Sequence, residues 1–290
     1  MSSVESTALD ELFSEGWLPT AVAHDSDAIV VEELAKVYPN GTEAVRGISF
    51  SVRRGEVYGI LGPNGAGKST TIGMLGTLIR STGGRALVSG IDVAVDPRGV
   101  QSKIGFAMQE VGVDELATGR EFLVLQGRLS GLTASEAGRR AGLLLRLVDL
   151  EDAADKRLNG YSNRMKRRAD LASALIHMPP ILFLDEPTEG LDPRGRVAIW
   201  DALQRLKVEL SITTVLTTHY MDEADRLCDR IGIIDRGRIV AEGTPHELKA
   251  SVAGPSLLHP TLEDVYLHYT GKSFEEIEKD AARDAGSDGS

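Results

Sequence analysis

The feature that most constrains this chain is a glycine-rich loop at residues 62–69, which reads Gly-Pro-Asn-Gly-Ala-Gly-Lys-Ser. The loop follows the apolar run 57–61 and precedes the helix-like run 70–78. This place between a strand and a helix is the context that the phosphate-binding pattern G-x-x-x-x-G-K-[ST] requires. Its glycines let backbone N–H groups turn towards phosphate oxygens, and the start of the helix adds its dipole. The loop therefore predicts a nucleotide phosphate site.

Two side chains of this loop carry specific roles in the pattern. Lys68 supplies a positive charge to the β- and γ-phosphates, and Ser69 offers a hydroxyl to Mg²⁺. We expect the nucleotide to contact the whole loop, which comprises Gly62, Pro63, Asn64, Gly65, Ala66, Gly67, Lys68, Ser69 and Thr70.

An acidic pair follows a second apolar run. Residues 181–186 read Ile-Leu-Phe-Leu-Asp-Glu, and the four apolar residues predict a strand that is buried on both faces. Asp185 then lies at the carboxyl end of the strand, where open α/β sheets place their ligands. An acid there can hold Mg²⁺, directly or through water, and Glu186 can polarise an attacking water.

Strand-like and helix-like runs alternate through the middle of the chain, which indicates the α/β class. The predicted strands are residues 28–36, 47–54, 56–61, 181–185, 213–217 and 231–235. The predicted helices are residues 119–131, 134–149, 162–177 and 194–210.

Charge and hydropathy exclude two classes of function. The 290 residues carry a formal net charge of -11, and general nucleic-acid binding needs clustered Lys and Arg, so no nucleic-acid partner is expected. The longest apolar runs fall far short of the roughly 18 residues of a membrane-spanning helix.

The negative charge is concentrated at the two ends of the chain. Residues 1–27 hold six acidic residues and no Lys or Arg, and residues 272–290 hold six acidic and three basic residues. These two tails therefore leave a charge of only -2 for residues 28–271.

The segments 62–70 and 181–188 resemble the Walker A and Walker B motifs of ABC transporter ATPase subunits. The resemblance covers about residues 28–271 and implies a P-loop NTPase (RecA-like) core with an antiparallel β subdomain and an α-helical subdomain. We expect the helical subdomain at about residues 110–178 and a C-terminal extension at about 251–271. The acidic segments 1–27 and 272–290 are expected to be flexible tails outside the ATPase domain.

The resemblance implies further site residues. Tyr38 is similar to the aromatic residue that stacks on adenine, and Gln109 to the glutamine that touches Mg²⁺ and water. Asp192 lies in Gly190-Leu-Asp, which resembles the D-loop, and His219 resembles the switch histidine that senses the γ-phosphate. Mg²⁺ would be held by Ser69, with Gln109 and Asp185 assisting, and Lys68, Gln109, Glu186 and His219 would carry the catalysis.

One branch of the family is the most similar. Residues 257–271 and 221–230 resemble segments of daunorubicin-resistance-type exporter ATPases. The resemblance implies an ATPase, peripheral on the cytoplasmic face of the membrane, that powers export of a drug-like, lipid or other hydrophobic substrate through a separate permease. The alternative is a soluble or regulatory ABC ATPase with low turnover.

The chain departs from the family at the signature segment, residues 161–165. The family usually has Leu-Ser-Gly-Gly-Gln here, whereas this chain has Tyr-Ser-Asn-Arg-Met. In the family the signature of one subunit faces the phosphate loop of the other, and Ser162 would cap the following helix and donate to the γ-phosphate. Glycines allow close approach. Asn163 and Arg164 are therefore expected to weaken hydrolysis; a cation at the γ-phosphate, like an arginine finger, is the alternative role for Arg164.

This departure bears on assembly. A homodimer would carry the altered signature at both ATP sites, whereas a heterodimer could place the intact phosphate site of this chain against an intact partner signature. The resemblance therefore favours a heteromeric pair of ATPase subunits over a homodimer. The basic residues Arg164, Lys166, Arg167 and Arg168 lie close together here, and their simplest interpretation is a solvated helix face.

Overall fold

The computed structural model describes residues 27–108, 115–254, 257–273 and 276. In this part of the chain the strands form one six-stranded and one four-stranded sheet. Residues 1–26 and most of the acidic segment 272–290 lie outside the described residues, and the predicted domain limits stay predictions.

The six-stranded sheet has the order β10-β9-β3-β8-β7-β6, and its strands are parallel except β10. Strands β3, β7 and β8 are buried along their whole length, which explains why they read as apolar or β-branched runs. The strands of this sheet are β3 (Val57–Leu61), β6 (Ile104–Ala107), β7 (Ile181–Asp185), β8 (Thr213–Thr218), β9 (Arg230–Asp235) and β10 (Arg238–Gly243).

The four-stranded sheet is antiparallel and has the order β2-β1-β4-β5. Its two long strands alternate between buried and exposed residues over part of their length, as a sheet with one solvated face does. The strands are β1 (Asp27–Val37), β2 (Glu43–Arg53), β4 (Gly83–Val88) and β5 (Ile91–Asp92).

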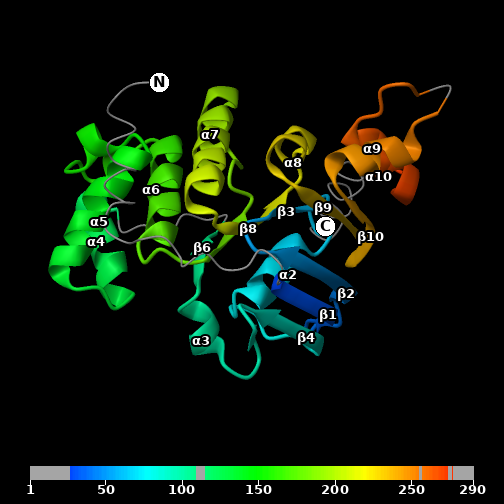
Figure 1. The fold of residues 1–290 in the computed structure, drawn as a ribbon, viewed down its shortest axis with the longest axis horizontal. Helices are drawn as coiled ribbons and strands as arrows, with labels where there is room; N and C mark the ends of the chain where they lie inside the picture. The colour runs from blue at the N-terminus through cyan, green and yellow to red at the C-terminus, as the bar shows by residue number, and fades with distance from the viewer. Residues whose placement is uncertain (1–26, 109–114, 255–256, 274–275, 277–290) are drawn as a thin grey trace, which may run out of the picture.

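The helices form groups around these sheets (Figure 1). Helix α2 lies between the two sheets, α7 and α8 cover the opposite face of the larger sheet, and α4, α5 and α6 gather at one end of the molecule. The helices are α2 (Lys68–Leu75), α3 (Pro97–Gln101), α4 (Gly119–Leu129), α5 (Ala134–Leu147), α6 (Asn163–Leu175), α7 (Pro193–Leu210), α8 (Met221–Leu227), α9 (Pro245–Val252) and α10 (Leu262–Thr270), with 3-10 turns η1 (Glu151–Ala153) and η2 (Leu158–Gly160).

Two apolar cores hold these layers together. One core fills the space between the sheets and includes Ile72 and Leu75 of α2 against Val31 of β1 and Phe183 of β7. The other core lies on the opposite face of the larger sheet, under the helices from α4 to α10. The larger sheet is therefore buried on both faces, which keeps its strand ends fixed relative to one another.

The predicted α/β architecture is confirmed, and the predicted strands and helices lie within a few residues of observed ones. The structure also contains strands β4, β5, β6 and β10, which the sequence pattern did not predict. The predicted helix 70–78 begins earlier, at Lys68, and ends at Leu75. Among the described residues, no helix has both the length and the apolar character needed to cross a bilayer.

Candidate active site

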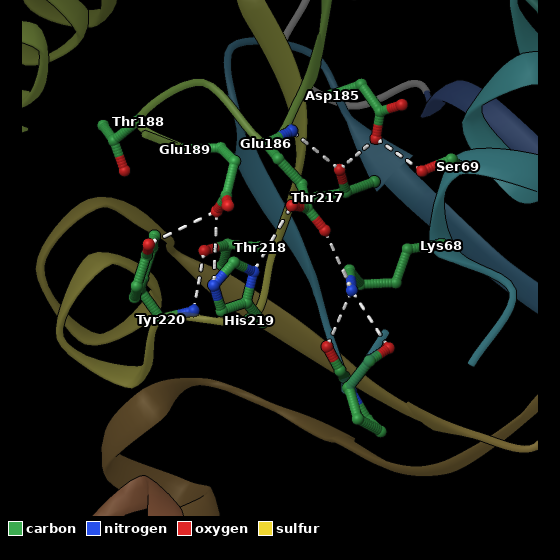
Figure 2. A network of polar contacts seen from close by, with 12 residues as sticks. Lys68, Ser69, Asp185, Glu186, Thr188, Glu189, Thr217, Thr218, His219 and Tyr220 are labelled. Carbon is green, nitrogen blue, oxygen red and sulfur yellow. Dashed lines mark hydrogen bonds and ion pairs between the residues drawn. The ribbon is translucent and has the colours of Figure 1, made fainter. Parts of the chain in front are cut away.

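The site is formed where three neighbouring parallel strands end. Strand β8 pairs with β3 on one side and with β7 on the other, so their carboxyl ends lie together. The phosphate loop follows β3, the acidic pair closes β7, and His219 follows β8. Segments separated by more than a hundred residues therefore meet at one edge of the sheet, as Figure 2 shows.

The phosphate loop has the backbone geometry of an anion site. Gly67 has a φ of 107°, in the left-handed region, and a side chain there would meet the Ala44 carbonyl oxygen at 2.4 Å. Helix α2 starts at the next residue, and no side chain of the described residues caps it. Its first N–H groups are thus left for a ligand.

Lys68 is buried and has three oxygen partners. Its Nζ donates to the carbonyl oxygens of Gly62 and Pro63 at 2.8 and 3.0 Å and lies 3.0 Å from Glu186 Oε1. The side chain is 3% exposed, so the ammonium group interacts more strongly with neighbouring charges than it would in water. In this state Lys68 therefore contacts both the loop and the acidic pair.

Asp185 faces the other end of the loop. Its Oδ1 accepts hydrogen bonds from the hydroxyls of Ser69, at 3.1 Å, and Thr217, at 2.5 Å. Thr217 lies on β8, and its Oγ1 also accepts from the Glu186 amide at 3.0 Å. No sequence pattern singles out Thr217, although it stands two residues before the predicted histidine. This threonine therefore holds the Asp185 carboxylate and the Glu186 backbone.

Glu186 has a φ of 48°, a left-handed conformation that is unfavourable for a residue with a side chain. The turn sends Glu186 away from Asp185 and towards Lys68 and His219 (Figure 2). Burial alone would raise the pKa of Glu186, but the contacts with His219 and Lys68 prevail and lower it to about 2. The carboxyl group is therefore ionised at neutral pH.

His219 lies between two carboxylates. Its Nδ1 is 3.3 Å from Glu186 Oε2, and its Nε2 is 3.3 Å from Glu189 Oε2. The contact with Glu186 raises the pKa of His219 against the opposing effect of burial, and Glu189 raises it further. Glu189 was not singled out by the sequence analysis, because one acid in an exposed turn carries no signal of its own.

Two groups of ligand atoms are suited to a cation. Glu186, Glu189 and His219 place ligand atoms within 4.8 Å of one another, but Lys68 already neutralises Glu186, which disfavours a metal there. The hydroxyl of Ser69 and the carboxylate of Asp185 are hard oxygen ligands of the kind that Mg²⁺ prefers.

Comparison with known proteins agrees with this geometry. The family profile described as ABC transporter matches residues 45–189. The daunorubicin/doxorubicin resistance ATP-binding protein DrrA of Streptomyces peucetius is 51% identical over 237 residues, which cover 82% of this chain and 71% of the relative. The chain belongs to the ABC transporter ATPases. It is thus an ATP-binding and ATP-hydrolysing subunit, and such subunits work with a membrane permease.

Solved structures of ABC ATPases give the same fold. The cbiO1 protein from Clostridium perfringens, part of the ABC transporter complex cbiONQ, superposes with a TM-score of 0.72 at 31% identity and covers 78% of this chain and 92% of its own. The dimeric ATP-binding cassette MJ0796, solved with ADP and Pi in a post-hydrolysis state, has a TM-score of 0.69 at 27% identity and covers 74% and 98%.

Two further predicted residues of this ABC ATPase, Tyr38 and Asp192, lie within the described part of the chain. Tyr38, at the end of β1, is half-buried, and its hydroxyl lies 3.2 Å from Thr70 Oγ1, which places the ring beside the phosphate loop. Asp192 caps α7 by accepting from the Gly195 amide at 2.9 Å. Gln109 lies outside the described residues.

The signature segment of this ABC ATPase lies at the start of α6. Ser162 caps the helix by accepting from the Met165 amide at 3.3 Å, and Tyr161 donates to the Ala153 carbonyl at 2.7 Å. Ser162, Asn163 and Arg164 are all exposed. The two residues that replace glycines therefore project from the surface without disturbing the cap.

The basic cluster does not form one solvated face, so that interpretation is wrong for its central member. Arg167 is only 5% exposed. Its guanidinium donates to the carbonyl oxygens of Asp185 and Pro187, both at 2.8 Å, and to that of Met108. Arg167 thus links α6 to the acidic pair and to the residue before Gln109.

Proposed function

We propose that this ATPase powers the export of a drug-like or other hydrophobic substrate through a separate membrane permease, on the cytoplasmic face of the membrane. The observation that carries this proposal is the set of Lys68, Asp185, Glu186 and His219 at one sheet edge. The chain is also 51% identical over 237 residues to a daunorubicin/doxorubicin resistance ATP-binding protein. The sequence similarity to drug-resistance subunits supports export, and it does not favour the alternative of a regulatory ATPase.

The residues of the site would divide the reaction between them. Backbone N–H groups of the loop and Lys68 bind the phosphates, and Tyr38 stacks on adenine. Incoming phosphates compete with Glu186 for Lys68, so substrate binding frees the Glu186 carboxylate. Glu186 is already ionised before ATP binds, because its pKa in that state is about 2. The freed carboxylate can accept a hydrogen bond from the attacking water. His219 then donates to the γ-phosphate as charge develops there.

Ser69 and Asp185 would hold a Mg²⁺ ion together with the nucleotide, and Gln109 is proposed as a further ligand. Oxygen donors 3.1 Å apart at the end of the loop suit this ion, which keeps several waters and binds few protein groups. The ion would neutralise charge on the β- and γ-phosphates.

A second ATPase subunit would complete each ATP site with its signature segment, and a D-loop that includes Asp192 would lie at the same interface. We propose that this partner is a different chain. The support is that Asn163 and Arg164 are exposed at the place where the family has glycines, while the phosphate side of the site is intact.

The test is to express the tagged chain together with its genomic neighbours, solubilise the membranes in detergent and purify the complex. We expect an integral membrane protein in the complex, and ATP hydrolysis that is lost in the Glu186→Gln variant. Vigorous hydrolysis by the purified chain alone, with no membrane protein bound to it, would overturn the proposal of a heteromeric exporter.

A further inference from the structure

Glu189 lies three residues after Glu186, in the turn that leads from β7 to α7, and its side chain is 39% exposed. Its Oε2 lies 3.3 Å from Nε2 of His219 and accepts a hydrogen bond from the Tyr220 hydroxyl, also at 3.3 Å. Figure 2 shows the three side chains turned towards one another at the edge of the site. Glu189 is therefore anchored by one neighbour while it contacts the other.

The His219 ring has a carboxylate at each nitrogen, since Nδ1 lies 3.3 Å from Glu186 Oε2. The ring also packs against the Tyr220 ring, with centroids 4.0 Å apart. A neutral imidazole can donate from only one nitrogen, so two carboxylates together favour the doubly protonated ring. Carboxylates thus lie near both ring nitrogens, and an aromatic ring lies near the imidazole.

The hold on Nε2 conflicts with the role of this histidine. A donor that is to reach the γ-phosphate needs a free N–H, and Nδ1 already faces the buried Glu186 carboxylate. The phosphate must therefore compete with Glu189 for Nε2. Glu189 is partly exposed, so its ion pair is weak enough for a phosphate to replace.

We propose that Glu189 is a positioning residue that holds Nε2 of His219 while no nucleotide is bound and releases it to the γ-phosphate. The inference rests on the proposed function of His219 as the γ-phosphate sensor. ATP must therefore displace Glu189 from Nε2 of His219 when it binds. ADP has no γ-phosphate and leaves this contact in place.

Several other charged groups face the same ring. Lys68, from α2, lowers the pKa of His219, and Glu186 raises it. Beyond Tyr220, the Arg196 guanidinium of α7 lies 4.6 Å from the tyrosine ring and pairs with Asp222 at 3.7 Å. All of these remain in a variant of Glu189, so its effect on the ring can be separated from theirs.

The experiment compares Glu189→Gln with the unchanged chain in binding of Mg²⁺–ATP and of ADP, measured by calorimetry. We expect ATP to bind about threefold more tightly and ADP with unchanged affinity, because an exposed ion pair of this kind contributes little. The pKa of His219, followed by NMR of labelled imidazoles, should fall because a neighbouring negative charge is lost. The six histidines are assigned with the help of His219→Ala.

Two control variants separate the contact between Glu189 and His219 from a general effect of nearby charge. Asp222→Asn removes one nearby negative charge that does not touch the ring, and should leave the ratio of ATP to ADP affinity and the His219 titration unchanged. Tyr220→Phe removes the hydroxyl that anchors Glu189, and should change both in the same direction as Glu189→Gln but by less.

Glu189→Gln that behaves like the unchanged chain, or that binds ATP more weakly, would overturn the inference. His219→Ala separates this failure from that of the proposed function. If His219→Ala keeps the same ratio of ATP to ADP affinity, the sensor role of His219 is wrong. If it changes that ratio while Glu189→Gln does not, only the role of Glu189 is wrong.

Discussion

The phosphate side of the site and the signature segment differ in how many of their polar groups are held within this one chain. On the phosphate side, Lys68, Asp185 and Glu186 are buried, and each has at least two polar partners, of which at least one belongs to another segment. In the signature segment, Asn163 and Arg164 are exposed side chains. The phosphate side of the site is therefore formed within one chain, whereas the signature segment is an exposed surface that is proposed to contact another subunit.

Helix α6 connects the two regions, and its residues change from exposed to buried within one turn. Its first residues belong to the exposed signature, while Arg167 is buried and donates to carbonyl oxygens on both sides of Glu186. One buried side chain therefore connects the helix that begins with the signature segment to the backbone that carries the acidic pair. We expect changes on the two sides of this turn to have very different effects, and the predictions below test that difference.

The largest effect is expected at Glu186. The Glu186→Gln variant should hydrolyse ATP about a thousandfold more slowly in the assembled transporter, because an amide cannot accept a proton from the attacking water. ATP affinity should not fall, because Lys68 keeps its charge for the phosphates and no longer pairs with a carboxylate. Hydrolysis is measured by phosphate release, and Glu263→Gln on the exposed face of α10 is the control. Hydrolysis that falls less than tenfold would contradict the role of Glu186.

The next effect is on stability, at Arg167. The Arg167→Met variant should lower the free energy of unfolding by about 3 kcal/mol, because it leaves Asp170 and three carbonyl oxygens without their buried donor. The matched change Arg164→Met, one turn earlier on the exposed side, should cost less than about 0.5 kcal/mol. Urea unfolding measures both. Equal losses in the two variants would contradict the contrast within α6.

A pH effect is expected at Asp170, the carboxylate beside Arg167. Burial raises its pKa to about 6, and Arg167 opposes this shift only in part, because the guanidinium also donates to carbonyl oxygens. A raised pKa in the folded state means that the folded chain binds the proton more tightly than the unfolded chain. Its contribution to stability is therefore complete below about pH 4 and is lost as the pH rises through about 6.

Relative to the unchanged chain, Asp170→Asn should remove this loss. The difference between their free energies of unfolding should shift by about 2 kcal/mol between pH 4 and pH 7, in favour of the variant at the higher pH. Urea unfolding at a series of pH values provides the measurement. Parallel curves would show that Asp170 titrates normally and that its burial has no consequence.

Most of the fold could be predicted from the sequence, because the central strands are short apolar runs between clear breaks. Strands β3, β7 and β8 are buried on both faces, so their composition shows them directly. Strand β6 is only four residues long and precedes a segment with no clear pattern, and β10 alternates weakly. Their place depends on pairing with β7 and β9, which is a tertiary effect that no local pattern contains.

The residues of the proposed phosphate site stand in recognisable sequence patterns, whereas the residues that contact and support them do not. Lys68 and Asp185 stand in patterns whose spacing reflects the chemistry of phosphate and Mg²⁺. Arg167 lies among other basic residues, and the sequence does not show that only this one points inwards. Thr217 and Glu189 are ordinary residues of a strand and a turn, and they gain a function only because β8 lies between β3 and β7.

The smallest effect separates the two regions most directly. Replacing both Asn163 and Arg164 by glycine should increase hydrolysis by the purified chain about tenfold, because two glycines allow a second copy of the chain to approach the phosphate loop closely. The phosphate side of the site is already formed within one chain. The double substitution therefore acts on the approach of the second copy to the phosphate loop. The cap made by Ser162 stays, and so the free energy of unfolding should fall by less than about 1 kcal/mol.

The single variants show which of the two residues matters. If steric bulk is the cause, Asn163→Gly and Arg164→Gly should each give part of the gain. If the arginine instead supplies a cation to the γ-phosphate, Arg164→Gly should lower hydrolysis, and Arg164→Lys should restore part of it. That result would reverse the comparison, because the exposed segment would then contribute a catalytic group and the chain would work as a pair of identical subunits.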